Sequence, residues 1–229
     1  MCRTRLRLSH GEAIYPAGLP VRLLKRAAEI GDGRYGRLRL QADAALMVRK
    51  HRPSRPAAQN WTMTGYEPMA FHLETERLSM RPFAVSDADE LSALWSERDT
   101  GTPGVERARE FIAERLARTA ETGLAALPIR RRDEGDFIGY CGLVVGRSTV
   151  EEPEIAYELL RRAHGRGYAT EAARAVLDAA IATGRKRLWA TVGAWNTPSF
   201  RVLEKLGFER DHVSTEDVGE VVWLTRSLP

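Results

Sequence analysis

The sequence predicts an α/β fold, in which a central mixed and mostly antiparallel sheet carries helices on its faces. Short stretches alternate apolar with polar residues, which is typical of strands, and longer stretches repeat apolar residues every three to four positions, as amphipathic helices do. Along the chain these stretches give a strand, two helices, three strands, a helix, a strand, a helix and two strands. This order predicts about six to seven strands and about four helices.

Residues 1–71 differ from the rest of the chain in charge and in pattern. They carry 13 Lys and Arg against 5 Asp and Glu, whereas residues 72–229 carry 22 against 26. Only Leu19 to Ile30 shows helical periodicity, so we expect a basic, mostly disordered extension over 1–71 and one domain over 72–229. An alternative is that translation starts at Met63 or Met69, just ahead of the first strong strand.

The overall composition excludes several classes of protein. With 43% apolar and 29% charged residues, no long apolar run and no signal-peptide core, a cytoplasmic protein without a membrane segment is expected. The only two cysteines, Cys2 and Cys141, lie far apart and outside any metal-ligand spacing, so no disulfide framework and no metal are expected. Nucleic-acid binding is not expected either, because the basic extension contains no recognisable reading motif.

The first half of the domain predicts a strand, two helices and a hairpin. Ser86, with Asp89 or Glu90 at capping-box distance, predicts the start of the first helix. In the second hairpin strand we expect Ile138, Tyr140, Gly142 and Val144 on one side. The expected elements are a strand from Glu74 to Phe83, helices from Ser86 to Trp95 and from Val105 to Thr122, and strands over Leu124 to Arg132 and Phe137 to Val145.

The second half predicts a strand that leads through a glycine loop into an amphipathic helix, and then further alternating elements. The expected elements are strands over Pro153 to Leu160, Lys186 to Gly193, Phe208 to Val213 and Val218 to Arg226, and helices from Ala169 to Ala182 and from Thr197 to Leu206. Trp95 and Trp189 are expected in the core, whereas Trp195 and Trp223 could line a substrate pocket or simply pack.

The glycine loop predicts an anion site. Gly165 and Gly167 lie two residues apart just before the helix, where backbone N–H groups and the helix dipole favour negative charge. A dinucleotide site is the alternative, but the loop follows three antiparallel-looking strands and the next strand, KRLWATVG, ends without an acidic residue.

Three motifs make this segment specific. Arg162 to Gly167 reads R-x-x-G-x-G, Asn196 to Phe208 contains N-x-x-S followed by LEK-x-GF, and Leu73 to Phe83 reads LETERLSMRPF. Together and in this order they resemble the GNAT N-acetyltransferase superfamily, and within it the branch of Rim-type ribosomal-protein N-terminal acetyltransferases. The resemblance covers about residues 72–229 and implies the GNAT fold for that domain.

The resemblance implies acetyl-CoA as co-substrate. In such enzymes the pantetheine arm pairs with the backbone of the strand before the loop, and the loop N–H groups hold the pyrophosphate. The residues implied in binding are Glu158, Leu159, Leu160, Arg162, His164, Gly165, Arg166, Gly167, Tyr168, Ala169, Thr170, Asn196 and Ser199.

The resemblance also implies two catalytic residues. Glu154 stands where some members place a general base, acting directly or through a water, and Ser199 stands where this branch offers a hydroxyl to the departing thiolate. Many members use a tyrosine as the acid, and the segment around Ser199 contains none. Glu154 could equally be a solvated carboxylate, and Asn196 with Ser199 a helix cap and its first turn.

The implied activity is transfer of the acetyl group to a primary amine by direct attack in a ternary complex. A protein N-terminus leads as acceptor, with a small amine, an amino acid or an antibiotic as alternatives. A CoA-binding sensor or interaction module without catalysis is the rival function. Monomer and homodimer both remain open.

Overall fold

The computed structural model describes residues 65–98, 104–217 and 219–229. The chain divides into two units, residues 18–59 and the remainder, and every described residue belongs to the second of these. The predictions for residues 1–64, including the helix from Leu19 to Ile30 and a start at Met63, lie outside the described residues. The boundary at residue 71 stays a prediction; Met69, just before it, is 2% exposed and its N–H donates to Gly123 O at 3.0 Å.

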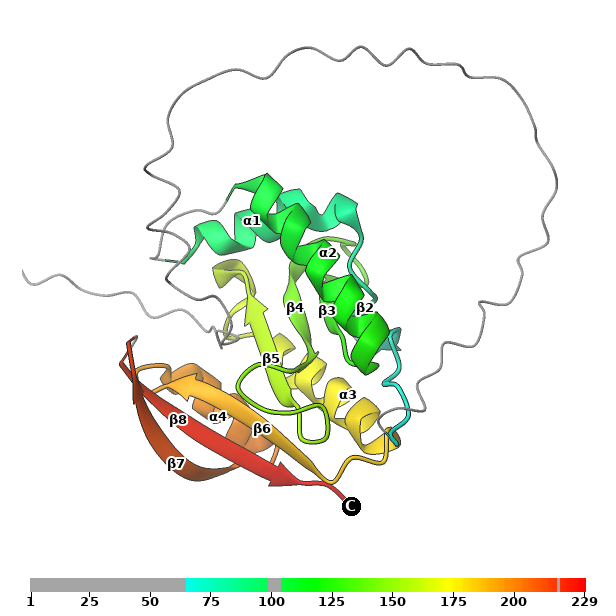
Figure 1. The fold of residues 1–229 in the computed structure, drawn as a ribbon. Coiled ribbons are helices and arrows are strands. Elements are labelled where there is room, and N and C mark those ends of the chain that lie inside the picture. Colours follow the sequence, from blue (N-terminus) through cyan, green and yellow to red (C-terminus); the bar gives the residue numbers. More distant parts are fainter. Residues whose placement is uncertain (1–64, 99–103, 218) are drawn as a thin grey trace, which may run out of the picture. The chain divides into compact units, whose positions relative to one another are not determined.

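A single sheet of eight strands organises the described residues, in the order β1-β2-β3-β4-β5-β6-β8-β7 (Figure 1). All neighbouring strands are antiparallel except β5 and β6. The predicted mixed, mostly antiparallel sheet is therefore confirmed, with one strand more than expected because the short β1 folds back on β2. The strands are β1 (Leu73–Glu74), β2 (Leu78–Met80), β3 (Ala126–Arg131), β4 (Phe137–Val144), β5 (Glu154–Leu159), β6 (Arg187–Gly193), β7 (Glu209–Glu216) and β8 (Gly219–Ser227).

The helices cover opposite faces of this sheet. One core cluster joins α1 and α2 to β3, β4 and β5, and the other joins α3 and α4 to the opposite face. Figure 1 shows α1 and α2 side by side over the half formed by β2 to β5, and α4 with β6, β7 and β8. No described helix is long and apolar enough to cross a membrane. The helices are α1 (Ala88–Ser96), α2 (Val105–Thr122), α3 (Tyr168–Ala182) and α4 (Thr197–Lys205), with 3-10 turns η3 (Val85–Asp87) and η4 (Arg161–Ala163).

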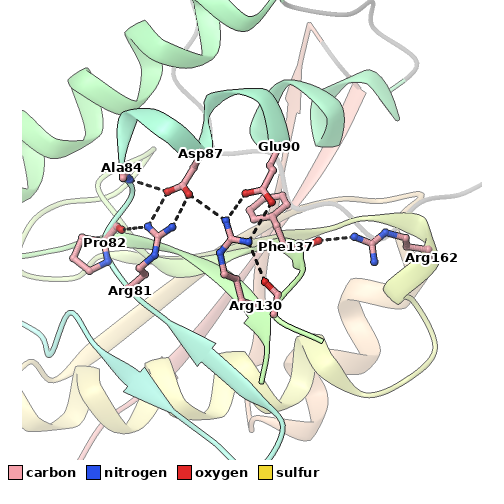
Figure 2. Close-up of polar contacts among 9 residues, drawn as sticks. Arg81, Pro82, Ala84, Asp87, Glu90, Arg130, Phe137 and Arg162 are labelled. Atoms are coloured by element: carbon pink, nitrogen blue, oxygen red, sulfur yellow. Dashed lines mark hydrogen bonds and ion pairs between the residues drawn. The ribbon is translucent and has the colours of Figure 1, made fainter. Parts of the chain in front are cut away.

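The start of α1 differs from the prediction. Asp87, not Ser86, organises it: its carboxylate accepts the N–H of Ala84 at 2.8 Å and two hydrogen bonds from Arg81 at 2.8 and 2.6 Å (Figure 2). Burial would raise the pKa of Asp87, but the hydrogen bonds from Arg81 and Ala84 hold it below its usual value. Arg130 of β3 adds contacts to Asp87 and Glu90, so this network fixes α1 on the sheet.

The pattern predicted for β4 is wrong at its first residues. Ile129 of β3 pairs with Gly139, but Arg130 pairs with Phe137, so a β-bulge at Ile138 changes the phase of the strand. As a result Ile138 packs in the α3–α4 core, whereas Tyr140 and Val144 pack with α1 and α2. Periodicity could not predict this, because both faces of β4 are buried and apolar.

The feature that positions the site is a splay between β5 and β6. β4 pairs with β5 along its whole length, from Val144 with Glu154 to Gly139 with Leu159. On the other side, β5 and β6 share the single pair of Glu154 with Trp189 and then run apart (Figure 1). Residues 155–159 therefore have no strand partner on the β6 side, which leaves a strand edge inside the sheet.

Candidate active site

The glycine loop lies between the end of β5 and the start of α3. Gly165 and Gly167 have φ of 71° and 81°, and Gly167 is the N-cap of α3 without a side-chain cap. A Cβ on Gly165 would meet nothing within 4 Å, so glycine is needed there for its left-handed backbone rather than for space. The first-turn N–H groups of α3 thus have no capping side chain, which suits an anion.

Two further contacts fix the shape of the loop. The His164 ring donates from Nε2 to the carbonyl oxygen of Leu159 at 2.8 Å, so this side chain holds the loop against the strand that precedes it. The N–H groups of Ala163 and His164 donate to the carbonyls of Leu160 and Arg161 at 2.8 and 3.1 Å. The loop is therefore preformed.

The N-terminal strand motif anchors the other side of α3. Arg77 contacts the carboxylate of Glu171 through Nε and Nη2 at 2.7 and 2.5 Å, and Thr75 Oγ1 donates to the same carboxylate at 2.5 Å. Arg77 Nη1 also donates to the carbonyl of Arg166 at 3.1 Å. The LETERL segment therefore serves to hold the helix and loop in register with the sheet.

A pocket of about 220 Å³ adjoins this loop. Its walls combine residues of the predicted loop with residues that sequence reasoning did not assign to the site, of which Arg131 of β3 is the most distinctive. The lining residues are Arg131, Ile138, Arg162, Ala163, Arg166 and Tyr168. Three guanidinium groups thus gather beside the candidate anion loop.

Glu154 lies at the closed end of the splay. Its residue is 2% exposed, and its carboxylate accepts the backbone N–H of Arg147 and the hydroxyl of Thr191 at 2.8 Å. Both donors are neutral, whereas the Arg147 guanidinium contacts Glu216 and Thr191 Oγ1. The alternative that Glu154 is solvated is therefore wrong, and within the described residues no cationic side chain forms an ion pair with its carboxylate.

Glu158, four residues further along the same face of β5, is arranged differently. Arg98 contacts both oxygens of its carboxylate, with Nε to Oε1 at 2.7 Å, and the hydroxyl of Tyr140 donates to Oε2 at 3.1 Å. Burial raises the pKa of Tyr140, which keeps this hydroxyl protonated as a donor. The Glu158 side chain is thus an ion-pair partner, and only its backbone faces the strand edge.

Asn196 and Ser199 lie at the start of α4, both 0% exposed. Asn196 Oδ1 accepts the N–H of Ser199 at 3.3 Å, so the predicted helix cap is confirmed. The hydroxyl of Ser199 has no hydrogen-bond partner within the described residues. The hydroxyl of Tyr157 on β5 donates to the carbonyl of Ser199 at 3.2 Å, which brings α4 up to the unpaired strand edge.

Aromatic side chains lie on the sheet face that carries Thr191. Trp223 is the register partner of Thr191, its ring meets that of Trp189 edge to face at 5.9 Å, and His212 stacks on it at 5.0 Å. Trp189 is half-buried, so the prediction that it lies in the core is wrong. Trp95 is buried, as predicted. Trp195 is 43% exposed.

Sequence reasoning missed residues that reach the site from distant elements. Thr191 lies 37 residues from Glu154 and Arg131 lies 31 residues before Arg162. Arg98, which neutralises Glu158, lies 60 residues before it. Arg131 belongs to a run of three arginines, Arg130 to Arg132, which in a hairpin is typical of a solvated face and does not single out one residue.

The comparisons with known proteins agree with this geometry. Residues 77–209 match the family model described as an acetyltransferase (GNAT) domain. The chain is 30% identical over 149 residues to the uncharacterized N-acetyltransferase p20 of Bacillus licheniformis, covering 61% of this chain and 83% of that protein.

Solved structures share the fold. An acetyltransferase of Agrobacterium tumefaciens superposes with a TM-score of 0.58 at 27% identity, covering 68% of this chain and 93% of the other. RimJ of Mycobacterium smegmatis, solved with a CoA disulfide, superposes with a TM-score of 0.58 at 22% identity, covering 71% and 88%. The family model spans more than half of the 229 residues of this chain, and the chain therefore belongs to the GNAT family of N-acetyltransferases.

Proposed function

We propose that this acetyltransferase moves the acetyl group of acetyl-CoA to a primary amine by direct attack within a ternary complex. The observation that carries the proposal is the splay of β5 from β6, because it places a free strand edge between the glycine loop, Glu154 and Ser199. The thioester supplies the activated acetyl group, and the protein has to orient it, accept a proton from the amine and stabilise the thiolate.

The donor occupies the edge of β5 and the loop. The amides of its pantetheine arm pair with the backbone at Glu158 to Leu160, as an added strand would. Of the N–H groups from Arg162 to Thr170, those of Ala163 and His164 donate within the loop, and the others hold the pyrophosphate, supported by the α3 dipole. The preformed loop and the uncapped helix start support this placement, since neither has to rearrange.

Glu154 is the general base, directly or through one water. Of the two buried carboxylates on this face of β5, Glu158 is neutralised by Arg98, whereas Glu154 is held by the neutral Arg147 N–H and Thr191 hydroxyl. A carboxylate that keeps its charge uncompensated is the better proton acceptor for an ammonium group. The amine then attacks the thioester carbonyl, and the carbon–sulfur bond breaks.

Ser199 stabilises the departing thiolate. A buried hydroxyl without a partner is rare in proteins and costs about 1–3 kcal/mol, so the site favours a ligand atom that accepts its hydrogen bond. Tyr157 fixes the backbone of Ser199 against β5 and so sets where this hydroxyl lies relative to the donor. The donated hydrogen bond, or its proton, offsets the charge that develops on sulfur.

A protein N-terminus is the acceptor that we favour. The match of the opening strand to the Rim-type branch supports it, as does the fold shared with RimJ. The face with Trp189, Trp223 and His212 adjoins Thr191 and offers aromatic surface beside Glu154, which suits a peptide more than a very small amine.

A thiol-release assay with acetyl-CoA tests this function. The acceptor panel contains peptides with free N-termini, the same peptides with blocked N-termini, amino acids, simple amines and aminoglycosides. We expect thiol release with free N-terminal peptides and none with the blocked ones. Binding of acetyl-CoA without release on any acceptor would favour the rival, a non-catalytic CoA-binding module, and release only with small amines would reassign the acceptor.

A further inference from the structure

The pocket beside the loop has the charge and the donors of a phosphate site. Arg131, Arg162 and Arg166 come to it from β3, η4 and the loop itself. Tyr168 adds a half-buried ring to the wall, and Ile138 and Ala163 close the apolar floor. Guanidinium groups present several N–H donors in a plane, which suits the oxygens of a phosphate.

Carboxylates form ion pairs with two of these arginines and leave some of their guanidinium N–H groups available. Asp136 accepts from Arg131 Nε at 2.7 Å and from Arg162 Nη1, and Glu134 accepts from Arg131 Nη1 at 2.7 Å. Arg162 Nη2 donates to the carbonyl of Phe137 at 2.6 Å (Figure 2). Three arginines face two carboxylates, so the pocket keeps a net positive charge and its guanidinium groups are oriented in advance.

The position of the pocket decides which phosphate fits it. β6 and the unpaired edge lie on one side of β5, whereas β4, with Ile138, lies on the other. In the proposed function the pantetheine arm follows the edge on the β6 side, and the pyrophosphate sits on the loop at the end of β5. The ribose with its 3′-phosphate follows the pyrophosphate in CoA, and the pocket adjoins the loop that would hold the pyrophosphate.

We propose that this pocket binds the 3′-phosphate of acetyl-CoA, with Arg131 as a binding residue from outside the glycine loop and Asp136 as the residue that positions Arg131 and Arg162. The inference rests on the proposed use of acetyl-CoA. Its consequence is selectivity: the protein prefers CoA over 3′-dephospho-CoA. A phosphomonoester carries close to two negative charges at neutral pH, so removing it removes the group with the greatest charge complementarity to the pocket.

Isothermal titration of CoA and of 3′-dephospho-CoA into the full-length chain tests the proposal. For wild type we expect CoA to bind about 10-fold tighter than 3′-dephospho-CoA, the effect of one strong charge-assisted contact. Arg131→Gln should weaken CoA by about 10-fold and 3′-dephospho-CoA by less than about 2-fold, so that the preference disappears.

Arg132→Gln is the matched control. Arg132 is adjacent in sequence and exposed, its guanidinium donates to the carbonyl of Thr75 at 2.9 Å, and it does not line the pocket. This variant should keep the wild-type preference for CoA. Arg166→Gln, which breaks no ion pair seen in the described residues, repeats the test should Arg131→Gln fail to fold.

Two results would overturn the proposal. Equal affinity of wild type for the two ligands would show that nothing in the protein reads the 3′-phosphate. An equal loss for both ligands in Arg131→Gln would place the pyrophosphate in this pocket instead. Absence of binding by either ligand to wild type would contradict the use of acetyl-CoA itself, and the two failures are therefore distinguishable.

Discussion

The two ends of β5 differ in the chemical groups that surround them. At its C-terminal end, the site consists of backbone N–H groups, positive-φ glycines and partly exposed arginines paired with carboxylates. Along the splay, the site consists of buried side chains: the Glu154 carboxylate has neutral donors, and the Ser199 hydroxyl has no hydrogen-bond partner within the described residues. In the proposed function, the first end binds the charge that the ligand carries, and the second end stabilises the charge that develops during the reaction.

The largest expected effects come from substituting the two buried carboxylates of β5, Glu154 and Glu158, which should change different properties. Glu154→Gln should lower kcat/KM by about 10²–10⁴-fold, the usual contribution of a general base, with the fold retained. Glu158→Gln should instead lower the free energy of unfolding by about 3–5 kcal/mol, because it breaks the buried ion pair with Arg98. Steady-state kinetics and denaturant unfolding measure both. Wild-type turnover in Glu154→Gln would remove Glu154 from the mechanism.

A pair of glycine substitutions tests the proposed phosphate site in the loop after β5. Gly165 and Gly184 have φ of 71° and 79°, and a Cβ on either would meet nothing within 4 Å; Gly184 lies in the turn between α3 and β6. Valine at either position should cost about 1–2 kcal/mol of stability through the same left-handed backbone. Only Gly165→Val should also weaken CoA binding, by about 10-fold or more, because only this loop cradles the anion. Equal CoA affinities for the two variants would contradict the loop assignment.

A smaller effect is expected from substituting Ser199, and it can be measured on bound CoA without an amine acceptor. Ser199→Ala should raise the pKa of the thiol of bound CoA by about one unit, as expected for the loss of one hydrogen bond to the thiolate. Thiolate absorbance of the bound ligand against pH measures the shift. Ser148→Ala is the control, since the Ser148 hydroxyl is also buried without a partner in the described structure but lies in the β4–β5 connection. An identical thiol pKa in all three proteins would exclude a contact of Ser199 with sulfur.

The smallest expected effect concerns the ion pairs of Asp136 and their contribution to thermal stability in acid. Hydrogen bonds from Arg131 and Arg162 lower the pKa of Asp136 to about 2, against the opposing effect of burial. Since this pKa lies below the unfolded value, the stabilisation is complete above about pH 4 and is lost as the pH falls toward 2. Between about pH 5 and pH 3 the melting temperature of wild type should fall about 2–4 °C more than that of Asp136→Asn, after allowance for solvent screening. Parallel melting curves for the two would show that the pair contributes nothing.

The sequence predicted most of the architecture and the position of the glycine loop. Helix and strand periods located the elements within a few residues, and the R-x-x-G-x-G loop was visible because its glycines and arginines are neighbours in the chain. Where apolar residues fill both faces, as in β4, periodicity carried no information and the bulge at Ile138 was missed. Ser86 was chosen over Asp87 as the start of the first helix because the partner that decides it, Arg81, acts through a tertiary ion pair.

The chemistry of the splay was only partly predictable. Glu154, Asn196 and Ser199 could be named from motifs, but their surroundings depend on contacts between residues far apart in sequence, such as Tyr157 with Ser199. Whether a carboxylate is neutralised is decided by such contacts, and no local pattern distinguishes Glu154 from Glu158. Tyr157, whose hydroxyl donates to the Ser199 carbonyl, lies 42 residues before it in the chain.

The incomplete pairing of β5 also bears on self-association. An unpaired strand edge at the rim of a sheet invites the strands of other chains and with them aggregation. Here the edge lies inside the sheet, closed at one end by the pair of Glu154 with Trp189 and bordered by α4 through Tyr157 and Ser199. A polypeptide strand would have to fit side chains on both faces of this gap, whereas a pantetheine arm brings amide groups on a slender chain. In the proposed function, this edge stays open to the pantetheine arm, while its position inside the sheet disfavours pairing with strands of other chains.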